Sequence, residues 1–129
     1  MITQVAAVSI YVEDQQVSLK FWTDKIGFEV KANRSMGPNA SWIELGPPTS
    51  LQTVEMQPCC SIVIYPRSMM PNWRELKPSI VFLCDDFEKT YTELKSKGVN
   101  FIEEEPKKMA WGTYAKFVDI DGNEFLLKG

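Results

Sequence analysis

Two stretches of this chain decide its fold, because each reads as a strand that leads into a helix. The first is Ile10-Tyr11-Val12-Glu13-Asp14 and the second is Phe82-Leu83-Cys84-Asp85-Asp86. Each is a short apolar run that ends in acidic residues, and about ten residues with the apolar spacing of a helix follow it. Each predicted helix then reaches a glycine, Gly27 or Gly98, and a further apolar run. The chain is therefore predicted to contain two copies of one structural module.

The bulk composition is that of one ordinary globular domain. The chain has 129 residues, a hydrophobic share of 44% and a charged share of 24%, which suit a domain with one continuous core. Its formal net charge is −3 and its pI is near 5.0. No basic stripe is available to neutralise phosphates, so nucleic acid is not an expected partner.

Neither a membrane span nor an export signal is expected. No apolar run approaches the ~18 residues of a transmembrane helix, and the opening residues lack the basic and apolar regions of a signal peptide. Cys59 and Cys60 are adjacent and Cys84 stands alone, which suggests no disulfide framework and no CxxC metal site. These thiols are interpreted as buried and free. Together the features predict a cytoplasmic protein with no membrane partner.

The same order of elements is predicted in both halves. In the first half we expect strands at residues 5–12, 28–32, 40–45 and 61–65, with a helix capped by Asp14 after the first strand. Val17 and Phe21 are expected on the face of that helix that packs on the sheet. In the second half we expect strands at residues 80–84, 99–103, 113–118 and 124–128, with a helix that opens on a capping box of Asp85 and Glu88.

The order β-α-β-β-β thus occurs twice, which predicts an α+β fold of eight strands and two helices in two similar sheets. Module 1 spans about residues 1–66 and module 2 about residues 79–129. Between them, residues 67–78 carry several prolines and are interpreted as a linker.

Several of these motifs resemble the vicinal oxygen chelate superfamily, which includes glyoxalase I, extradiol dioxygenases, and fosfomycin and bleomycin resistance proteins. Val12-Glu13-Asp14, Phe21-Trp22 and Ile26-Gly27-Phe28-Glu29-Val30 resemble its opening module. The segment from Phe117 to Phe125 resembles its closing turn, with Ile120 in place of the usual proline. The similarity covers nearly the whole chain.

The resemblance implies one glyoxalase/bleomycin-resistance-like domain, residues 1–129, in which the two modules form an open, cup-shaped mixed β-sheet barrel around a metal ion. Four inward side chains hold that ion in the family, and by position they are here Ala7, Val63, Ser79 and Leu126. Alanine, valine and leucine have no lone pair for a divalent ion, neutral serine is a poor ligand, and the chain has no histidine. No metal or other cofactor is therefore expected.

Two glutamates keep a metal-dependent alternative open. Glu44 lies in an apolar-Glu-apolar pattern, and Glu124 would face the cavity after a register shift. If either binds a metal, the alternative cofactor is a divalent ion such as zinc, nickel, manganese or iron. The simpler interpretation places Glu44 on the solvent side or rim of its strand.

A cup without a metal still offers a cavity for a small-molecule ligand. Strand alternation places Ala7, Ser9 and Tyr11 on one face, and an arginine near the mouth would suit a carboxylate or phosphonate group. Taken singly, each aromatic residue is better explained by packing in a core or a dimer than by contact with a ligand. The candidate ligand-binding residues are Tyr11, Arg34, Trp42, Tyr65, Trp111 and Tyr114.

Three functions therefore stand. The first is a metal-free, small-molecule-binding protein of the bleomycin-resistance type, and the second is a metal-dependent lyase or dioxygenase of the glyoxalase I or extradiol dioxygenase type. The third is a small structural or regulatory dimer. Enzymatic activity is left open, because no nucleophile and base fall into a recognised pair and the catalytic residues are unknown. A homodimer is expected, since pairing would cover free strand edges and apolar faces.

Overall fold

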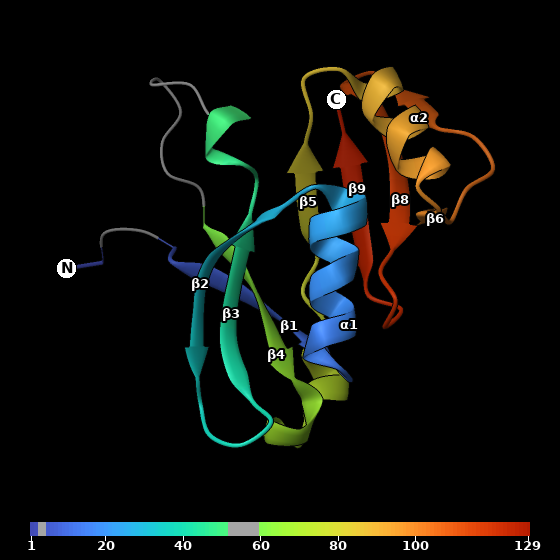
Figure 1. Ribbon diagram of the computed structural model, residues 1–129. Coiled ribbons are helices and arrows are strands. Elements are labelled where there is room, and N and C mark those ends of the chain that lie inside the picture. The colour runs from blue at the N-terminus through green and yellow to red at the C-terminus, as the bar shows by residue number, and fades with distance from the viewer. Residues whose placement is uncertain (3–4, 52–59) are drawn as a thin grey trace. The chain divides into compact units, whose positions relative to one another are not determined.

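Residues 1–2, 5–51 and 60–129, which the computed structural model describes, fall into two units (Figure 1). Unit 1 is Met1–Pro78 and unit 2 is Ser79–Gly129. Each unit combines one mixed β-sheet with a helix. Among the described residues no helix is long and apolar enough to cross a membrane.

Unit 1 builds a four-stranded sheet whose strand order is β1-β4-β3-β2. Strand β1 runs parallel to β4, and β3 runs antiparallel to both β4 and β2. The elements are β1 (Ala7–Val12), α1 (Gln15–Lys20), the π-helical turn η1 (Phe21–Ile26), β2 (Glu29–Ser35), β3 (Ser41–Gly46), η2 (Thr49–Leu51), β4 (Ser61–Pro66), and the short 3₁₀ turns η3 (Arg67–Met69) and η4 (Trp73–Glu75).

Unit 2 repeats this design with a five-stranded sheet. Four of its strands follow the order β5-β9-β8-β6, and the fifth strand, β7, pairs with β8. Strand β5 is parallel to β9, and the remaining pairs are antiparallel. The elements are β5 (Ile80–Leu83), α2 (Phe87–Ser96), β6 (Asn100–Phe101), β7 (Lys107–Met109), β8 (Gly112–Val118) and β9 (Glu124–Lys128).

The predicted α+β fold with two mixed sheets and a repeated module is confirmed, whereas the cup-shaped closure of the sheets stays a prediction. Some details of the prediction were wrong. The first strand begins at Ala7, because Val5 is exposed and lies outside the sheet. The described sheets contain one strand more than expected, β7. The segment that was interpreted as a linker, residues 67–78, forms the turns η3 and η4 and is grouped with unit 1, and its role as a linker stays a prediction.

Short polar side chains set the ends of both helices. Asp14 caps α1 as predicted, since its Oδ1 accepts hydrogen bonds from the backbone N–H groups of Gln16 at 2.9 Å and Val17 at 3.2 Å. In unit 2 the cap is Asp86 rather than the predicted Asp85, and its Oδ1 accepts from Lys89 N at 3.2 Å. The caps place each helix directly after the first strand of its unit.

The buried face of α1 is more polar than its sequence suggests. The predicted packing residue Val17 is 51% exposed, whereas Phe21 is buried as predicted, and the polar residues Gln15 and Ser18 of α1 are buried as well. The Gln15 side-chain amide donates to the carbonyl oxygens of Ser41 at 2.6 Å and Ile64 at 2.9 Å, and its oxygen accepts from Ser41 N at 3.1 Å. These bonds join α1 to β3 and β4.

Replacing Gln15 tests this connection. Gln15→Ala removes the bonds to Ser41 and Ile64 from a buried site, and we expect the free energy of unfolding to fall by about 1–3 kcal/mol. The matched control is Gln16→Ala, whose exposed side chain follows in sequence. Urea denaturation followed by circular dichroism measures both variants, and an equal, small loss in the two would contradict the role of Gln15.

The closing turn of unit 2 is organised by one buried carboxylate. Asp119 Oδ1 accepts from Asp121 N at 2.9 Å and Asn123 N at 2.8 Å, and Oδ2 accepts from Asn123 Nδ2 at 3.0 Å. Gly122 adopts a left-handed φ of 80°, which completes the turn between β8 and β9. Burial raises the pKa of the Asp119 carboxyl above its ordinary value, although these hydrogen bonds act in the opposite direction.

This raised pKa predicts a specific pH dependence. The folded state holds the Asp119 proton more tightly than the unfolded state, so stability from this group falls as pH rises from the ordinary value through the raised one. Asp119→Asn keeps an oxygen acceptor and removes the ionisation. We expect the unfolding free energy of wild type minus that of the variant to decrease between about pH 3 and pH 7. A flat difference in chemical denaturation across this range would contradict the prediction.

Candidate functional site

One face of the unit 1 sheet is left open by α1. Strand alternation buries Ile10 and Val12 completely and leaves the side chains of Ser9 and Tyr11 half-buried on the opposite side. The register between strands extends this second face across the sheet. The paired residues are Ser9 with Val63, Tyr11 with Tyr65, Glu44 with Val63, Ala32 with Glu44, and Arg34 with Trp42.

Three aromatic side chains meet on this face. The ring centroid of Tyr65 lies 6.0 Å from that of Tyr11 and 6.2 Å from that of Trp42, and both pairs are edge-to-face. Such pairs hold one another in fixed orientations. The sequence analysis named all three residues as candidate ligand contacts. We call Tyr11, Trp42, Glu44 and Tyr65 the aromatic face.

Glu44 is the acidic member of the aromatic face. It is half-buried between two apolar cross-strand partners, Ala32 and Val63. Its Oε1 accepts a hydrogen bond from Trp42 Nε1 at 2.8 Å. The sequence analysis favoured a glutamate on the solvent side or rim, whereas the structure places it among the aromatic side chains. Strand alternation alone places Trp42 and Glu44 on one face, but the burial of Glu44 depends on its cross-strand partners Ala32 and Val63, which no local pattern reveals.

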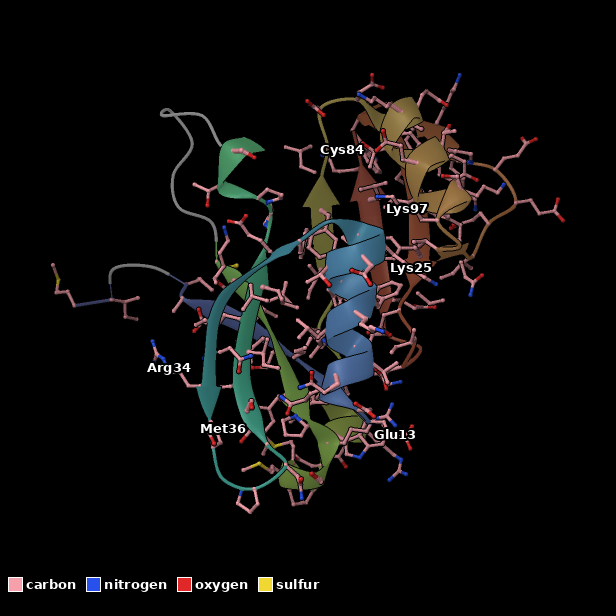
Figure 2. All side chains as sticks on the ribbon, in the orientation of Figure 1. Glu13, Lys25, Arg34, Met36, Cys84 and Lys97 are labelled. Atoms are coloured by element: carbon pink, nitrogen blue, oxygen red, sulfur yellow. The ribbon has the colours of Figure 1, made fainter. Side chains whose placement is uncertain are left out.

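Arg34 stands apart from this group. It lies on β2, at the end of the described strand order of the sheet, and its side chain is exposed. Figure 2 shows it extending away from the strand. Its cross-strand partner is Trp42. Arg34 therefore shares a face with the aromatic residues but is surrounded by solvent.

A hollow of about 450 Å³ borders the aromatic face within unit 1. Its lining joins Ser9 and Tyr11 of β1 to residues that were predicted as linker: Glu75, Leu76, Lys77 and Pro78. The preceding turn is braced by cation–π contacts, because the guanidinium carbons of Arg67 and Arg74 lie 4.0 and 4.7 Å from the ring centroid of Trp73. No site was predicted in this segment. Its prolines and mixed charges gave no signal of one.

A second, more polar hollow of about 510 Å³ lies beside the start of α1. Its lining includes Asp14 and Gln15, which cap the helix and join it to the sheet, and Ser35, Asn39 and Ser41. Glu13, at the end of β1, also lines it (Figure 2). Since Asp14 and Gln15 already have structural partners, this hollow is the weaker candidate for a ligand site.

Unit 2 has an aromatic pair of its own. Trp111 and Tyr114 stack with centroids 5.5 Å apart, and Lys128 Nζ lies 5.2 Å from the Trp111 centroid. Trp111 is 52% exposed. Tyr114 and Lys128 are cross-strand partners between β8 and β9. Both aromatic residues were candidate ligand contacts, and the structure brings them together with a cation.

The residues present do not fit a metal ion. Ala7, Val63 and Leu126 carry no donor atom, and Ser79 is exposed just before β5. Glu44 cannot take the position of a last-strand ligand, because β4 follows β3 and carries Val63 opposite it. Glu124 is exposed at the start of β9 in unit 2. Within the described ranges, no three His, Cys, Asp or Glu residues group closely enough to hold a metal ion.

Cys84 is a poor nucleophile in this arrangement. Burial raises the pKa of the Cys84 thiol, and Asp85 and Asp86 act in the same direction. Its Sγ lies 3.4 Å from the carbonyl oxygen of Lys128, at the end of β5 (Figure 2). Cys60 is exposed rather than buried as predicted. Cys59 lies outside the described residues.

The chain belongs to the Glyoxalase/Bleomycin resistance protein/Dioxygenase superfamily, whose family model matches residues 4–127. This confirms the resemblance found in the sequence. The chain is 47% identical over 128 residues to the uncharacterized protein YetH of Bacillus subtilis (strain 168), with 99% of each chain covered.

Two solved structures are similar over nearly their whole length. A member of the same superfamily from Sphaerobacter thermophilus DSM 20745 is 27% identical with a TM-score of 0.81, covering 98% of this chain and 97% of that one. TnmS3, an antibiotic binding protein from Streptomyces sp. CB03234, is 26% identical with a TM-score of 0.76, covering 98% of this chain and 95% of that one.

Proposed function

We propose that this protein binds a small molecule with a planar or aromatic body on the aromatic face of unit 1, without a metal ion. The observation that carries the proposal is the cluster of Tyr11, Tyr65 and Trp42 on the sheet face opposite α1, beside the hollow at Ser9. Aromatic walls with a few placed polar groups are typical of small-molecule sites. The similarity to TnmS3, an antibiotic binding protein, supports binding rather than catalysis.

The unit 1 sheet supplies both parts of such a site. The rings of Tyr11 and Tyr65 offer faces and edges for stacking, and the neighbouring hollow adds the apolar surface of Leu76 and Pro78. Polar contacts are available from the Ser9 hydroxyl and the Glu44 carboxylate. We also propose that the stacked pair of Trp111 and Tyr114, taken within unit 2, offers an aromatic contact of its own for a small molecule, and that Arg34 meets a ligand of the unit 1 face only at its solvent-exposed end.

A metal-dependent lyase or dioxygenase is the weaker proposal. Both activities need a divalent ion held by several imidazole or carboxylate ligands. The chain has no histidine, and Glu44 and Glu124 are the sole fallback donors that the sequence suggested. The donor set of this chain therefore gives that chemistry no observation in its favour.

The central prediction concerns Tyr65, which touches both other rings. Tyr65→Leu removes the aromatic contact and we expect it to weaken ligand binding at least about tenfold, which is about 1.4 kcal/mol. Tyr65→Phe is the matched control, because it keeps the ring and loses only the hydroxyl. A ligand is first found by thermal-shift screening of antibiotics and aromatic metabolites, and affinities are then measured by isothermal titration calorimetry.

Two outcomes would contradict the proposal. One is that no planar or aromatic compound in the screen binds to the wild-type protein. The other is that Tyr65→Leu, shown by circular dichroism to be folded, binds the ligand as tightly as wild type.

We further propose that the chain forms a homodimer. Strands β1 and β5 each end the described strand order of their sheets, which leaves backbone groups that pairing can satisfy. Val81 and Leu83 on β5 are 56% and 75% exposed, and apolar side chains of this kind favour association. Light scattering on the eluting protein is expected to give twice the monomer mass of 14.8 kDa. A mass of 14.8 kDa at micromolar concentration would rule out a stable dimer.

A further inference from the structure

We propose that Glu44 selects ligands that carry a positive charge, so that the aromatic face binds organic cations with an aromatic body. This inference rests on the proposed function, because it names the charge of the ligand that the same site would bind. The observation behind it is that one carboxylate lies within a group of three aromatic rings. Trp42 Nε1 donates to its Oε1 at 2.8 Å, and Trp42 contacts Tyr65, which contacts Tyr11.

The chemistry of these side chains is that of a cation site. The faces of Trp and Tyr rings attract ammonium groups, and this attraction grows when water is excluded. A carboxylate adds a full negative charge close to the same position. It has about four acceptor positions, so the bond from Trp42 leaves Glu44 able to accept hydrogen bonds from a ligand. Rings and carboxylate together thus favour a charged amine.

The surroundings of Glu44 strengthen its effect. Its cross-strand neighbours are the methyl group of Ala32 and the fully buried Val63. A half-buried charge among apolar groups is screened less by salt than one in open solvent. The indole donor also fixes the carboxylate on the strand face, so little side-chain entropy is lost when a ligand binds.

Other charges near the face do not reverse this preference. Arg34 is exposed on β2, where solvent and salt screen its charge. Glu75 and Lys77, which line the hollow beside Tyr11, carry opposite charges and offset each other to first order. Glu44 is therefore the half-buried charge of the aromatic face.

Three probes with the same naphthalene body test the charge preference, and the cationic and neutral ones also share their shape. They are a naphthylethyl trimethylammonium ion, its neutral tert-butyl counterpart, and the naphthalene carboxylate of the same chain length. Calorimetry with the wild-type protein is expected to show the cation binding about tenfold more tightly than the neutral probe and the carboxylate binding most weakly.

The variant Glu44→Gln isolates the charge from the shape. Glutamine keeps an oxygen that can accept from Trp42 Nε1, so the arrangement of the rings is retained. We expect the variant to lose the preference for the cation, so that the cationic and neutral probes bind to it with similar affinities. The matched control is Glu93→Gln, which changes the net charge equally on the exposed surface of α2 and is expected to keep the preference.

The possible results separate this inference from the proposed function. If the neutral and cationic probes bind equally, or if Glu44→Gln keeps the cation preference, the role of Glu44 is overturned while aromatic binding stands. A wild-type preference for the carboxylate would likewise overturn it and implicate Arg34. If none of the probes binds wild type at millimolar concentration, both the aromatic site and the role of Glu44 are overturned.

Discussion

The side-chain amide of Gln15 determines which face of the unit 1 sheet is covered. It bonds to the backbone of Ser41 on β3 and of Ile64 on β4, two strands that lie far from it in sequence. A buried amide without these partners would cost free energy, so the helix is held in one position over the strands. The face beneath α1 is thereby closed, and the helix leaves the opposite face of the sheet uncovered.

The proposed binding face follows from this division through the alternation of β-strands. Side chains at alternate positions point to opposite faces, so Tyr11, Tyr65 and Trp42 are collected on the open side while Ile10 and Ile64 are buried under the helix. A slip of one residue in β4 would exchange Tyr65 for a buried isoleucine. The ladder between β1 and β4 therefore sets the core and the candidate site together.

Sequence reasoning succeeded where the signal was local. Alternation predicted the shared face of Ser9 and Tyr11, and the Asp14 cap could be read from a few residues of chain. It failed where a distant contact decides the outcome. Gln15 is buried and the predicted Val17 is exposed, because backbone groups on β3 and β4 need the partners that Gln15 supplies. The hollow at Glu75 arises from a turn braced around a tryptophan, which no periodicity reveals.

The changes at the family's metal positions alter which interactions are able to bind a ligand. Ala7 and Val63 cannot coordinate an ion. Beside apolar side chains a metal ion would lose its water ligands and gain none from the protein, which costs free energy. In the proposed site, affinity comes from burial of ligand area against rings, and this burial discriminates little between ligands of one shape. A directed charge is the simplest added source of selectivity, because wrong partners leave it unpaired. In unit 1 the half-buried carboxylate of Glu44, fixed by Trp42, meets that requirement.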